Sequence, residues 1–428
     1  MSLSRRQLMV ATGCGVIVGG AALLKPHDNG APHNAYFVAL TQALKQAGLA
    51  QPTLVIDKHA LEHNIQQVQQ NIAQKQPALP VRLVVKSLPS LALLDYLSTR
   101  LQTQRFMVFN LPMLSTVLTQ YPQGDFLLGK PMAALAVQEW LKVDANRAAL
   151  PKIQWLVDSI ERLNEYTQLA AQFNVVLNIN FEIDVGLHRG GFTQMQDLAS
   201  AVKAAKYNAQ LKITGLMGYE AHVGKMPSIL NMQQRAWDSM QATYQQALAV
   251  LEKEGYDPAQ LTLNSGGSPT YTLHTQRPTL ANEVSIGTAF VQPFDFDMAT
   301  LSQHQAACFI ATPVLKALDH ALIPAIEWAD GMRRWWDANN QHGYFIHGGN
   351  WLAKPVSPQG LALSALYGRS SNQELWLGSA SQHLQVNDYV FFRPQQSEAV
   401  FLQFGDITLF DKEKSQIVDK WPVFSMSA

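Results

Sequence analysis

The feature that most constrains the fold is the alternation of short apolar segments with helical patterns over residues 82–286. Several segments are apolar on successive residues, as in Phe126, Leu127 and Leu128, which is typical of parallel strands covered on both faces. Eight strand–helix units in about 210 residues predict an α/β fold of the (β/α)8 TIM-barrel type. A doubly wound parallel sheet stays open as an alternative, because periodicity does not separate the two. The eight predicted strands are 82–86, 105–109, 125–129, 153–158, 176–183, 212–218, 261–264 and 283–286.

The pattern changes after about residue 295. Helical periodicity fades, and clusters of Gly, Pro, Ser and Asn separate short strand signals. We therefore predict a barrel over 51–295 and a C-terminal, mainly β domain over 296–428, with an early strand at 53–56 as a candidate to pair with the latter. The predicted β-domain strands are 308–314, 343–347, 374–378, 388–393 and 398–403.

The N-terminus has the pattern of an export signal. Arg5 and Arg6 precede an apolar run over 10–24, which is short of the roughly 20 residues of a full membrane span. We expect a twin-arginine-like signal over 1–30 and a linker over 31–50, and hence a periplasmic or otherwise exported protein. An ordinary secretory signal and an uncleaved anchor remain alternatives. Membrane contact is expected only through this segment.

Charge and cysteine content narrow the partners. The 428 residues carry 32 basic and 32 acidic side chains, for a net charge of zero. Nucleic acid is thereby disfavoured as a main partner, because phosphate binding needs a surplus of Lys and Arg. Cys14 falls in the expected export signal, so the mature chain would hold one thiol, Cys308, and no disulfide.

The opening strand of the predicted barrel ends in a lysine. Lys86 follows an apolar run, and in a barrel the carboxyl ends of strands hold the catalytic groups. Desolvation lowers the pKa of a lysine and favours Schiff-base chemistry. The position alone also fits a lysine whose amine simply reaches water at a strand end.

Three more strand ends carry polar or glycine-rich chemistry. Residues 181–191 place Arg189 beside a glycine turn, where its guanidinium suits an anionic oxygen; a salt-bridged loop is the alternative. Tyr219 and His222 are candidates to pack against a ring or relay a proton, although a lone histidine is often structural. Ser265, Gly266, Gly267 and Ser268 suit a phosphate cradle, or form only a turn.

Order and spacing together give these segments a family resemblance. Residues 50–428 resemble fold-type III pyridoxal 5′-phosphate (PLP) enzymes, the alanine racemase N-terminal domain superfamily, and most of all its D-threonine aldolase and D-serine dehydratase branch. The most specific motif is the Glu-Ile-Asp-Val-Gly-Leu-His-Arg-Gly-Gly run at 182–191. Other carriers are Asp57, Leu61, Asn64, Lys86 with Ser87, Asp158 with Ser159, 215–222, 265–268, 282–287, 381–383, 387–388 and 391–394.

The resemblance implies a role for each candidate. Lys86 would bind PLP covalently as an imine and shuttle the α-proton, and Arg189 would lie near the phenolic oxygen of the cofactor. Tyr219 and His222 would line the ring. Ser265, Gly266, Gly267 and Ser268 would hold the phosphate. The substrate would be a small amino acid, and the assembly would be a homodimer with active sites at its interface.

The sequence departs from that branch in places that matter. The branch binds a metal through Pro-x-His-x-Cys or Pro-x-His-x-Asp, whereas this chain has Gln396 for the histidine and Glu398 for the second ligand. Glutamine is a poor zinc ligand, so we predict no metal site, with Glu398 as the remaining candidate. Alanine racemases place an arginine against the pyridine nitrogen. Here Ser285 takes that position, with Glu283 as a possible neighbour.

Three functions follow from these features. The first is a PLP lyase that cleaves or dehydrates a β-hydroxy D-amino acid. The second is an amino-acid racemase, which needs no metal but needs a second base, for which Tyr344 and His347 are candidates. The third is a PLP-binding protein without turnover, which the added β domain disfavours.

Overall fold

The chain forms two compact units in a computed structural model that describes residues 25–227 and 229–425. One, the barrel unit, comprises residues 54–227, 229–308, 394–411 and 418–425. The other, the β unit, comprises residues 25–53, 309–393 and 412–417. The twin-arginine motif and apolar run of the expected export signal lie outside the described residues.

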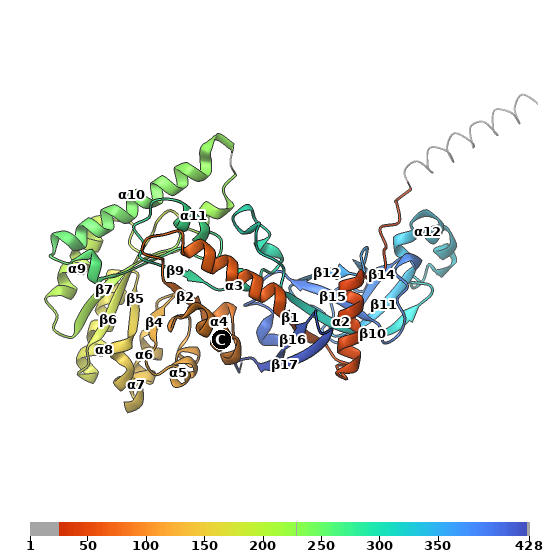
Figure 1. Ribbon diagram of the computed structural model, residues 1–428, viewed down its shortest axis with the longest axis horizontal. Coiled ribbons are helices and arrows are strands. Elements are labelled where there is room, and N and C mark those ends of the chain that lie inside the picture. Colours follow the sequence, from red (N-terminus) through yellow and green to blue (C-terminus); the bar gives the residue numbers. More distant parts are fainter. Residues whose placement is uncertain (1–24, 228, 426–428) are drawn as a thin grey trace, which may run out of the picture. The chain divides into compact units, whose positions relative to one another are not determined.

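Eight parallel strands close into a barrel (Figure 1). The ring closes where β2 pairs with β9, with Val81 opposite Val284. This closure confirms the (β/α)8 prediction and excludes the doubly wound sheet. The strands are β2 (Val81–Val84), β3 (Arg105–Val108), β4 (Asp125–Leu128), β5 (Ile153–Val157), β6 (Leu177–Ile183), β7 (Leu211–Gly218), β8 (Thr262–Ser265) and β9 (Glu283–Ile286).

Helices alternate with the strands, and polar residues fix where several of them begin. Side chains of Asp57, Ser90, Asn110 and Ser159 accept backbone N–H groups at the starts of α3, α4, α5 and α8. Leu61, Ile65 and Val68 of α3 are buried, as their spacing predicts. The helices are α3 (Lys58–Ile72), α4 (Leu91–Leu101), α5 (Leu111–Gln120), α6 (Ala134–Leu141), α7 (Asp144–Ala149), α8 (Ile160–Phe173), α9 (Met195–Lys206), α10 (Met232–Lys253) and α11 (Tyr271–Gln276).

A further parallel pair in the barrel unit joins distant parts of the sequence. β1 (Thr53–Asp57) pairs with β16 (Asp406–Asp411), with Leu54 opposite Ile407, so the early strand does pair with the C-terminal stretch. The strand predicted at 398–403 is wrong. There the carbonyl of Ser397 accepts the N–H groups of Val400 and Phe401, which winds the backbone into a 3-10 turn at Phe401–Gln403. β17 (Gln416–Pro422) follows β16.

The β unit is built on antiparallel strands, in which β10 pairs with both β11 and β15. β11 also pairs with β14, and β14 with β13. Within the predicted linker, the structure has helix α2 (Ala35–Gln46), whose Phe37 packs on the rings of Phe309 and Phe391. The remaining elements are β10 (Cys308–Leu318), α12 (Asp330–Trp336), β11 (His342–His347), β12 (Ala353–Ser357), β13 (Ala362–Leu363), β14 (Gln373–Gly378) and β15 (Tyr389–Pro394).

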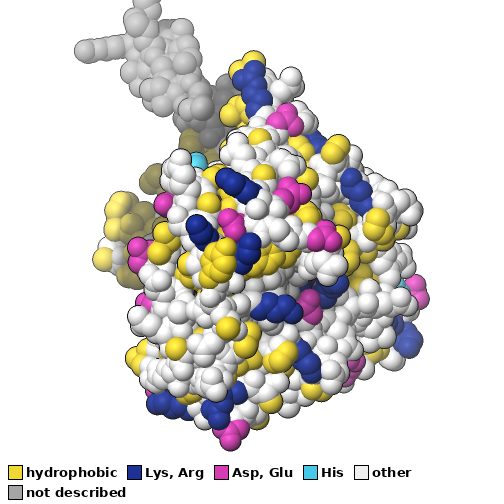
Figure 2. Space-filling view, turned by 90° about the vertical axis from the view of Figure 1, so that its left-hand side faces the viewer, with side chains coloured by type: hydrophobic (Ala, Val, Ile, Leu, Met, Phe, Trp, Pro, Cys, Tyr) yellow, Lys and Arg dark blue, Asp and Glu magenta, His cyan; other side chains and the backbone are white. Residues whose placement is uncertain are grey.

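The surface of the barrel unit carries charges of both signs. On the face that Figure 2 shows, Lys and Arg side chains are interspersed with Asp and Glu rather than gathered into one field. This mixture agrees with the net charge of zero. Within 25–227 and 229–425, none of the helices has the length and apolar character needed to cross a bilayer.

Candidate active site

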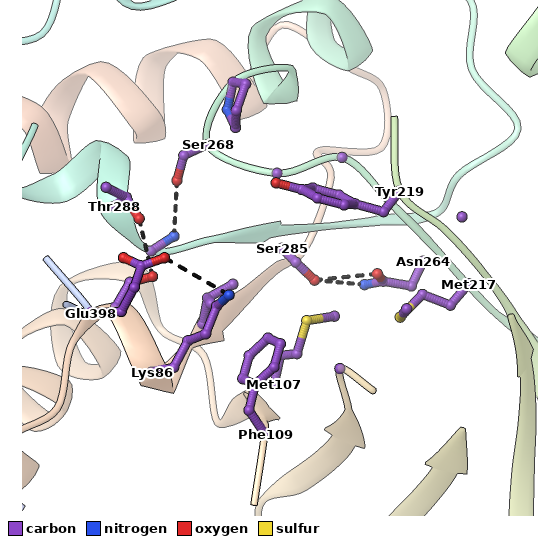
Figure 3. A pocket seen from close by; sticks show the side chains of 18 of the residues that line it. Lys86, Met107, Phe109, Met217, Tyr219, Asn264, Ser268, Ser285, Thr288 and Glu398 are labelled. Atoms are coloured by element: carbon purple, nitrogen blue, oxygen red, sulfur yellow. Dashed lines mark hydrogen bonds and ion pairs between the residues drawn. The ribbon is translucent and has the colours of Figure 1, made fainter. Parts of the chain in front are cut away.

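A cavity of about 580 Å³ opens at the carboxyl ends of the barrel strands, within the barrel unit. This is the end of a TIM barrel that carries catalytic groups. Residues at or just after the carboxyl ends of β2, β3, β7, β8 and β9 supply most of its wall (Figure 3). They include Lys86, Ser87, Met107, Phe109, Met217, Tyr219, Asn264, Ser268, Ser285 and Thr288, with Arg189, Phe296 and Glu398.

Lys86 stands in a 3-10 turn, Val85–Ser87, that directly follows β2. The amine lies 4.5 Å from the centre of the Phe109 ring and 3.8 Å from a carboxylate oxygen of Glu398. Lys86 and Glu398 point toward one another across the cavity (Figure 3). Glu398, the remaining metal-ligand candidate from the sequence, is thus an ion-pair partner of the predicted Schiff-base lysine.

Hydroxyl groups gather next to this amine. Thr288 donates a hydrogen bond to the Ser87 hydroxyl at 3.0 Å. The Ser268 hydroxyl accepts the N–H groups of Gly287, at 3.3 Å, and Ala289, at 3.0 Å. Ser268 is where the sequence predicts a phosphate ligand. Thr288 was missed by sequence reasoning, and its one local signal was its position after the strand-ending Gly287.

Glycines let the backbone come close at the same place. A Cβ added to Gly267 would lie 2.6 Å from a carbon of the Tyr219 ring. A Cβ added to Gly287 would lie 2.8 Å from the Cβ of Val84. Gly266 has φ +77°, which L side chains rarely adopt. The result is a concave wall of backbone and hydroxyls beside an amine, which fits the phosphate and the aldehyde of PLP.

A buried carboxylate holds this glycine loop in place. Glu220 accepts hydrogen bonds from the Ser265 hydroxyl at 2.6 Å, the Gly266 N–H at 3.1 Å, and the Thr270 hydroxyl. Burial alone would raise the pKa of Glu220, but His274 at 3.2 Å and these hydrogen bonds outweigh it and lower that pKa. Ser265, predicted to hold phosphate, therefore faces Glu220 and does not line the cavity, whereas Gly266, Gly267 and Ser268 do.

Arg189 and Tyr219 meet at the cavity wall. The guanidinium lies 4.7 Å from the centre of the tyrosine ring and 3.9 Å from a carboxylate oxygen of Glu182. Burial raises the pKa of Tyr219 to about 12, so its phenol is neutral near pH 7. Burial also raises the pKa of Glu182 to about 7, against the attraction of Arg189. The motif at 182–191 thus places the Arg189 guanidinium at the cavity wall, beside a Glu182 carboxyl whose pKa is about 7.

The structure does not bring His222 to the cavity wall. The ring lies against Gly186, where an added Cβ would be 3.3 Å from Nε2. Burial lowers the pKa of His222, which favours a neutral imidazole. The two second-base candidates, Tyr344 and His347, belong to β11 of the β unit, where Tyr344 is buried.

Neutral groups occupy the position where the family resemblance would place the pyridine nitrogen. Ser285 exchanges hydrogen bonds with the side-chain amide of Asn264, at 2.9 and 3.3 Å. Glu283 does not line the cavity, because its carboxylate pairs with Arg82 at 2.6 Å and with Arg105 at 2.7 Å. Glu283 is linked to the cavity through Asn264, whose side-chain amide donates a hydrogen bond to the Glu283 carboxylate at 2.8 Å.

The stretch that replaces the branch's metal motif makes other contacts. The amides of Gln395 and Gln396 each lie 3.4 Å from a carboxylate oxygen of Asp295. Across the described part of the chain, there is no cluster of three or more His, Cys, Asp or Glu side chains arranged to hold a metal ion.

The family model for the alanine racemase N-terminal domain matches residues 56–292, more than half of the sequence. The chain belongs to this family. Members of the family use PLP and are built on the barrel described above. The family match covers the strand-end residues that line the cavity, apart from Phe296 and Glu398.

Solved structures share this fold at low identity. D-threonine aldolase from Filomicrobium marinum is 13% identical over 93% of this chain and 98% of its own, with a TM-score of 0.68. D-threo-3-hydroxyaspartate dehydratase from Delftia sp. HT23 is 15% identical over 94% and 100%, also at 0.68. Alanine racemase from Bacillus anthracis is 11% identical over 87% and 98%, at 0.63. No curated protein matches the sequence.

Proposed function

We propose that this chain is a PLP-dependent lyase that acts on a small β-hydroxy D-amino acid, by aldol cleavage or by dehydration. The observation that carries the proposal is the Lys86 amine in a glycine- and hydroxyl-lined cavity, 3.8 Å from the carboxylate of Glu398. When bound, PLP supplies an aldehyde for the lysine and an electron-withdrawing ring that weakens the bonds at Cα.

Each wall of the cavity has a part in this proposal. Gly267, Ser268 and Thr288 would hold the phosphate, since their backbone and hydroxyls form its concave side. Tyr219 would pack against the ring, with Arg189 beside it to face an anionic oxygen. Lys86 would attach the aldehyde carbon and move the proton at Cα of the substrate. Met107, Phe109 and Met217 add apolar wall, which limits water at the reacting carbon.

Glu398 supplies the acid or base that a lyase needs at the substrate's β-hydroxyl. Aldol cleavage needs a base that takes the proton of the β-hydroxyl, and dehydration needs an acid that protonates the leaving oxygen. A carboxylate on the cavity wall provides either group without a metal.

A racemase is the second candidate, and the same ion pair favours it. Racemisation needs two proton-transfer groups, and Lys86 and Glu398 are two such groups that face one another in the cavity. In this alternative Glu398 serves as the second base, in place of Tyr344 or His347. A protein that binds PLP but turns over no amino acid is the remaining outcome.

Product analysis separates these reactions. Purified protein is incubated with PLP and D-threonine or D-serine, with and without divalent metal. Glycine with acetaldehyde, or a keto acid with ammonia, identifies a lyase. A change in enantiomer ratio on chiral chromatography, without these products, identifies a racemase. Unchanged amino acids throughout would refute both.

Cofactor attachment is tested apart from turnover. Borohydride reduction should fix PLP to the peptide that contains Lys86, as read by mass spectrometry, even if no tested amino acid reacts. An adduct elsewhere, or none, would overturn the assigned roles. We also propose export through the N-terminal segment and a homodimeric assembly. Cell fractionation and light scattering of the purified protein test these two points.

A further inference from the structure

An exposed apolar surface lies on the β unit, around helix α12 (Asp330–Trp336). We call it the tryptophan patch and define it as Ile326, Trp328, Met332, Trp335 and Trp336. Trp328 is 81% exposed and Met332 66% exposed, and all five residues of the patch lie within one short segment, 326–336. Contiguous exposed apolar side chains mark an interaction surface.

Ion pairs and hydrogen bonds of its arginines fix α12 in place, while its tryptophan side chains stay exposed. Arg333 and Arg334 both pair with Asp330, at 2.8 and 2.7 Å. Arg333 also donates to the backbone carbonyls of Asn340 and Ala321, each at 2.6 Å. The arginines are thus engaged in fixing the helix, and the patch is a fixed feature of the unit rather than a loose end.

The described chain begins at this same surface. The amine of Lys25 lies 5.5 Å from the centre of the Trp335 ring. Asn339 donates to the carbonyl of His27 at 2.7 Å and accepts the N–H of Asn29 at 2.8 Å. Residues 25–29 are therefore fastened beside α12, and the apolar sequence over 10–24 is covalently joined to the molecule at the edge of the tryptophan patch.

We propose that the tryptophan patch docks on a phospholipid bilayer into which the apolar residues 10–24 insert. Tryptophan is enriched where apolar and aqueous phases meet, because its ring is amphipathic. A second membrane contact on the same molecule raises the effective affinity without strengthening either contact. The patch supplies that second contact because the anchor leaves the fold next to it.

The charge around the patch sets the kind of lipid. Residues 319–340 hold four carboxylates, at 319, 327, 330 and 337, against two arginines, for a net charge of −2. We therefore expect burial of the tryptophan rings, and not attraction to anionic headgroups, to drive docking of the patch. We expect docking on neutral phosphatidylcholine vesicles, with no gain from added phosphatidylglycerol.

Hydrogen exchange of the full chain tests the proposal, with and without phosphatidylcholine vesicles. On vesicles, exchange over 322–336 should slow at least about fivefold, whereas β11 and β14 should not change. The double variant Trp328→Ser with Trp335→Ser should still sediment with vesicles through residues 10–24 but lose this protection. The matched control is Tyr207→Ser on the barrel unit, an exposed aromatic side chain outside the patch, which should behave as the wild type.

The affinity gives a second readout. The double variant should bind vesicles at least about tenfold more weakly than the wild type, with an unchanged melting temperature since both rings are exposed. Three results would overturn the proposal. They are unchanged exchange over 322–336 on vesicles, equal affinity of the two proteins, and protection without lipid that grows with protein concentration. The last would assign the patch to a second copy of the chain.

Discussion

Arg82 on β2 and Lys86 in the turn that follows β2 are basic side chains with opposite surroundings. Arg82 on β2 is fully buried, and all three nitrogens of its guanidinium donate hydrogen bonds. Its partners are the carboxylates of Glu283 and Asp125 and two backbone carbonyls. Lys86, four residues later, is part-exposed, with its nearest carboxylate 3.8 Å away. β2 thus carries one satisfied charge inside the barrel, and the turn that follows it carries one available charge at the mouth.

This difference in surroundings suits Arg82 to a structural role and Lys86 to a chemical one. Burial alone would lower the pKa of Arg82, but the charges of Glu283 and Asp125 outweigh it and raise that pKa above its ordinary value. A charge held by so many partners has no donor left for a ligand. The Lys86 amine, with an apolar ring on one side and a carboxylate on the other, is free to form a new bond.

Removing the available charge should have the largest effect on function. We expect Lys86→Ala to abolish borohydride-trapped cofactor and to lower turnover at least about 10³-fold, because in the proposed function the amine both attaches the aldehyde and moves the proton. The melting temperature should stay within about 2 °C, since the amine satisfies no buried partner. Lys212→Ala, an exposed lysine on β7, is the matched control. Retained attachment in Lys86→Ala would break the comparison.

Removing the satisfied charge should have the largest effect on stability. Arg82→Met leaves Glu283 and Asp125 without their main partner, and the free energy of unfolding in urea should fall by about 3–5 kcal/mol. Adding Glu283→Gln should recover part of the loss, because one of the stranded charges is removed. A loss below about 1 kcal/mol would mean that the buried network is not what holds these strands.

The carboxylate that faces Lys86 should matter for turnover and little for folding. Glu398→Gln keeps the size of the side chain and removes its charge, so we expect kcat to fall about 10²-fold with cofactor attachment intact. Glu398→Asp should retain more activity than Glu398→Gln. Full activity in Glu398→Gln would exclude a proton-transfer role and leave Lys86 as the working group of the pair.

The smallest effect is expected at Glu182, a charge between the two extremes. Its pKa is raised by burial from 4.5 to about 7, so the native state holds this proton more tightly than the unfolded chain does. The resulting stability is full below pH about 4.5 and is lost as pH rises through about 7. Over that window the free energy of unfolding should fall by about 2 kcal/mol more in the wild type than in Glu182→Gln. Parallel pH curves for the two proteins would contradict this.

The sequence allowed the barrel to be predicted because its signals are local. Each apolar run sits within one element, so the eight barrel strands, β2 to β9, could be placed from the sequence. The linker prediction missed α2, whose buried face is defined by Phe309 and Phe391, residues far away in the sequence. The strand predicted at 398–403 failed for the same kind of reason. Its apolar residues satisfy local turn bonds, and the strand that pairs with β1 comes later.

For the candidate site, the sequence by itself was enough to predict residues that line the cavity, including Lys86, Arg189, Tyr219 and the glycine loop. Only the tertiary structure decided how those groups are used. It turned Ser265 toward Glu220, kept His222 off the cavity wall, and brought Glu398 to Lys86 across more than 300 residues. Local patterns record backbone preferences, whereas the pairing of charges depends on chain closure between distant segments, which no single segment encodes.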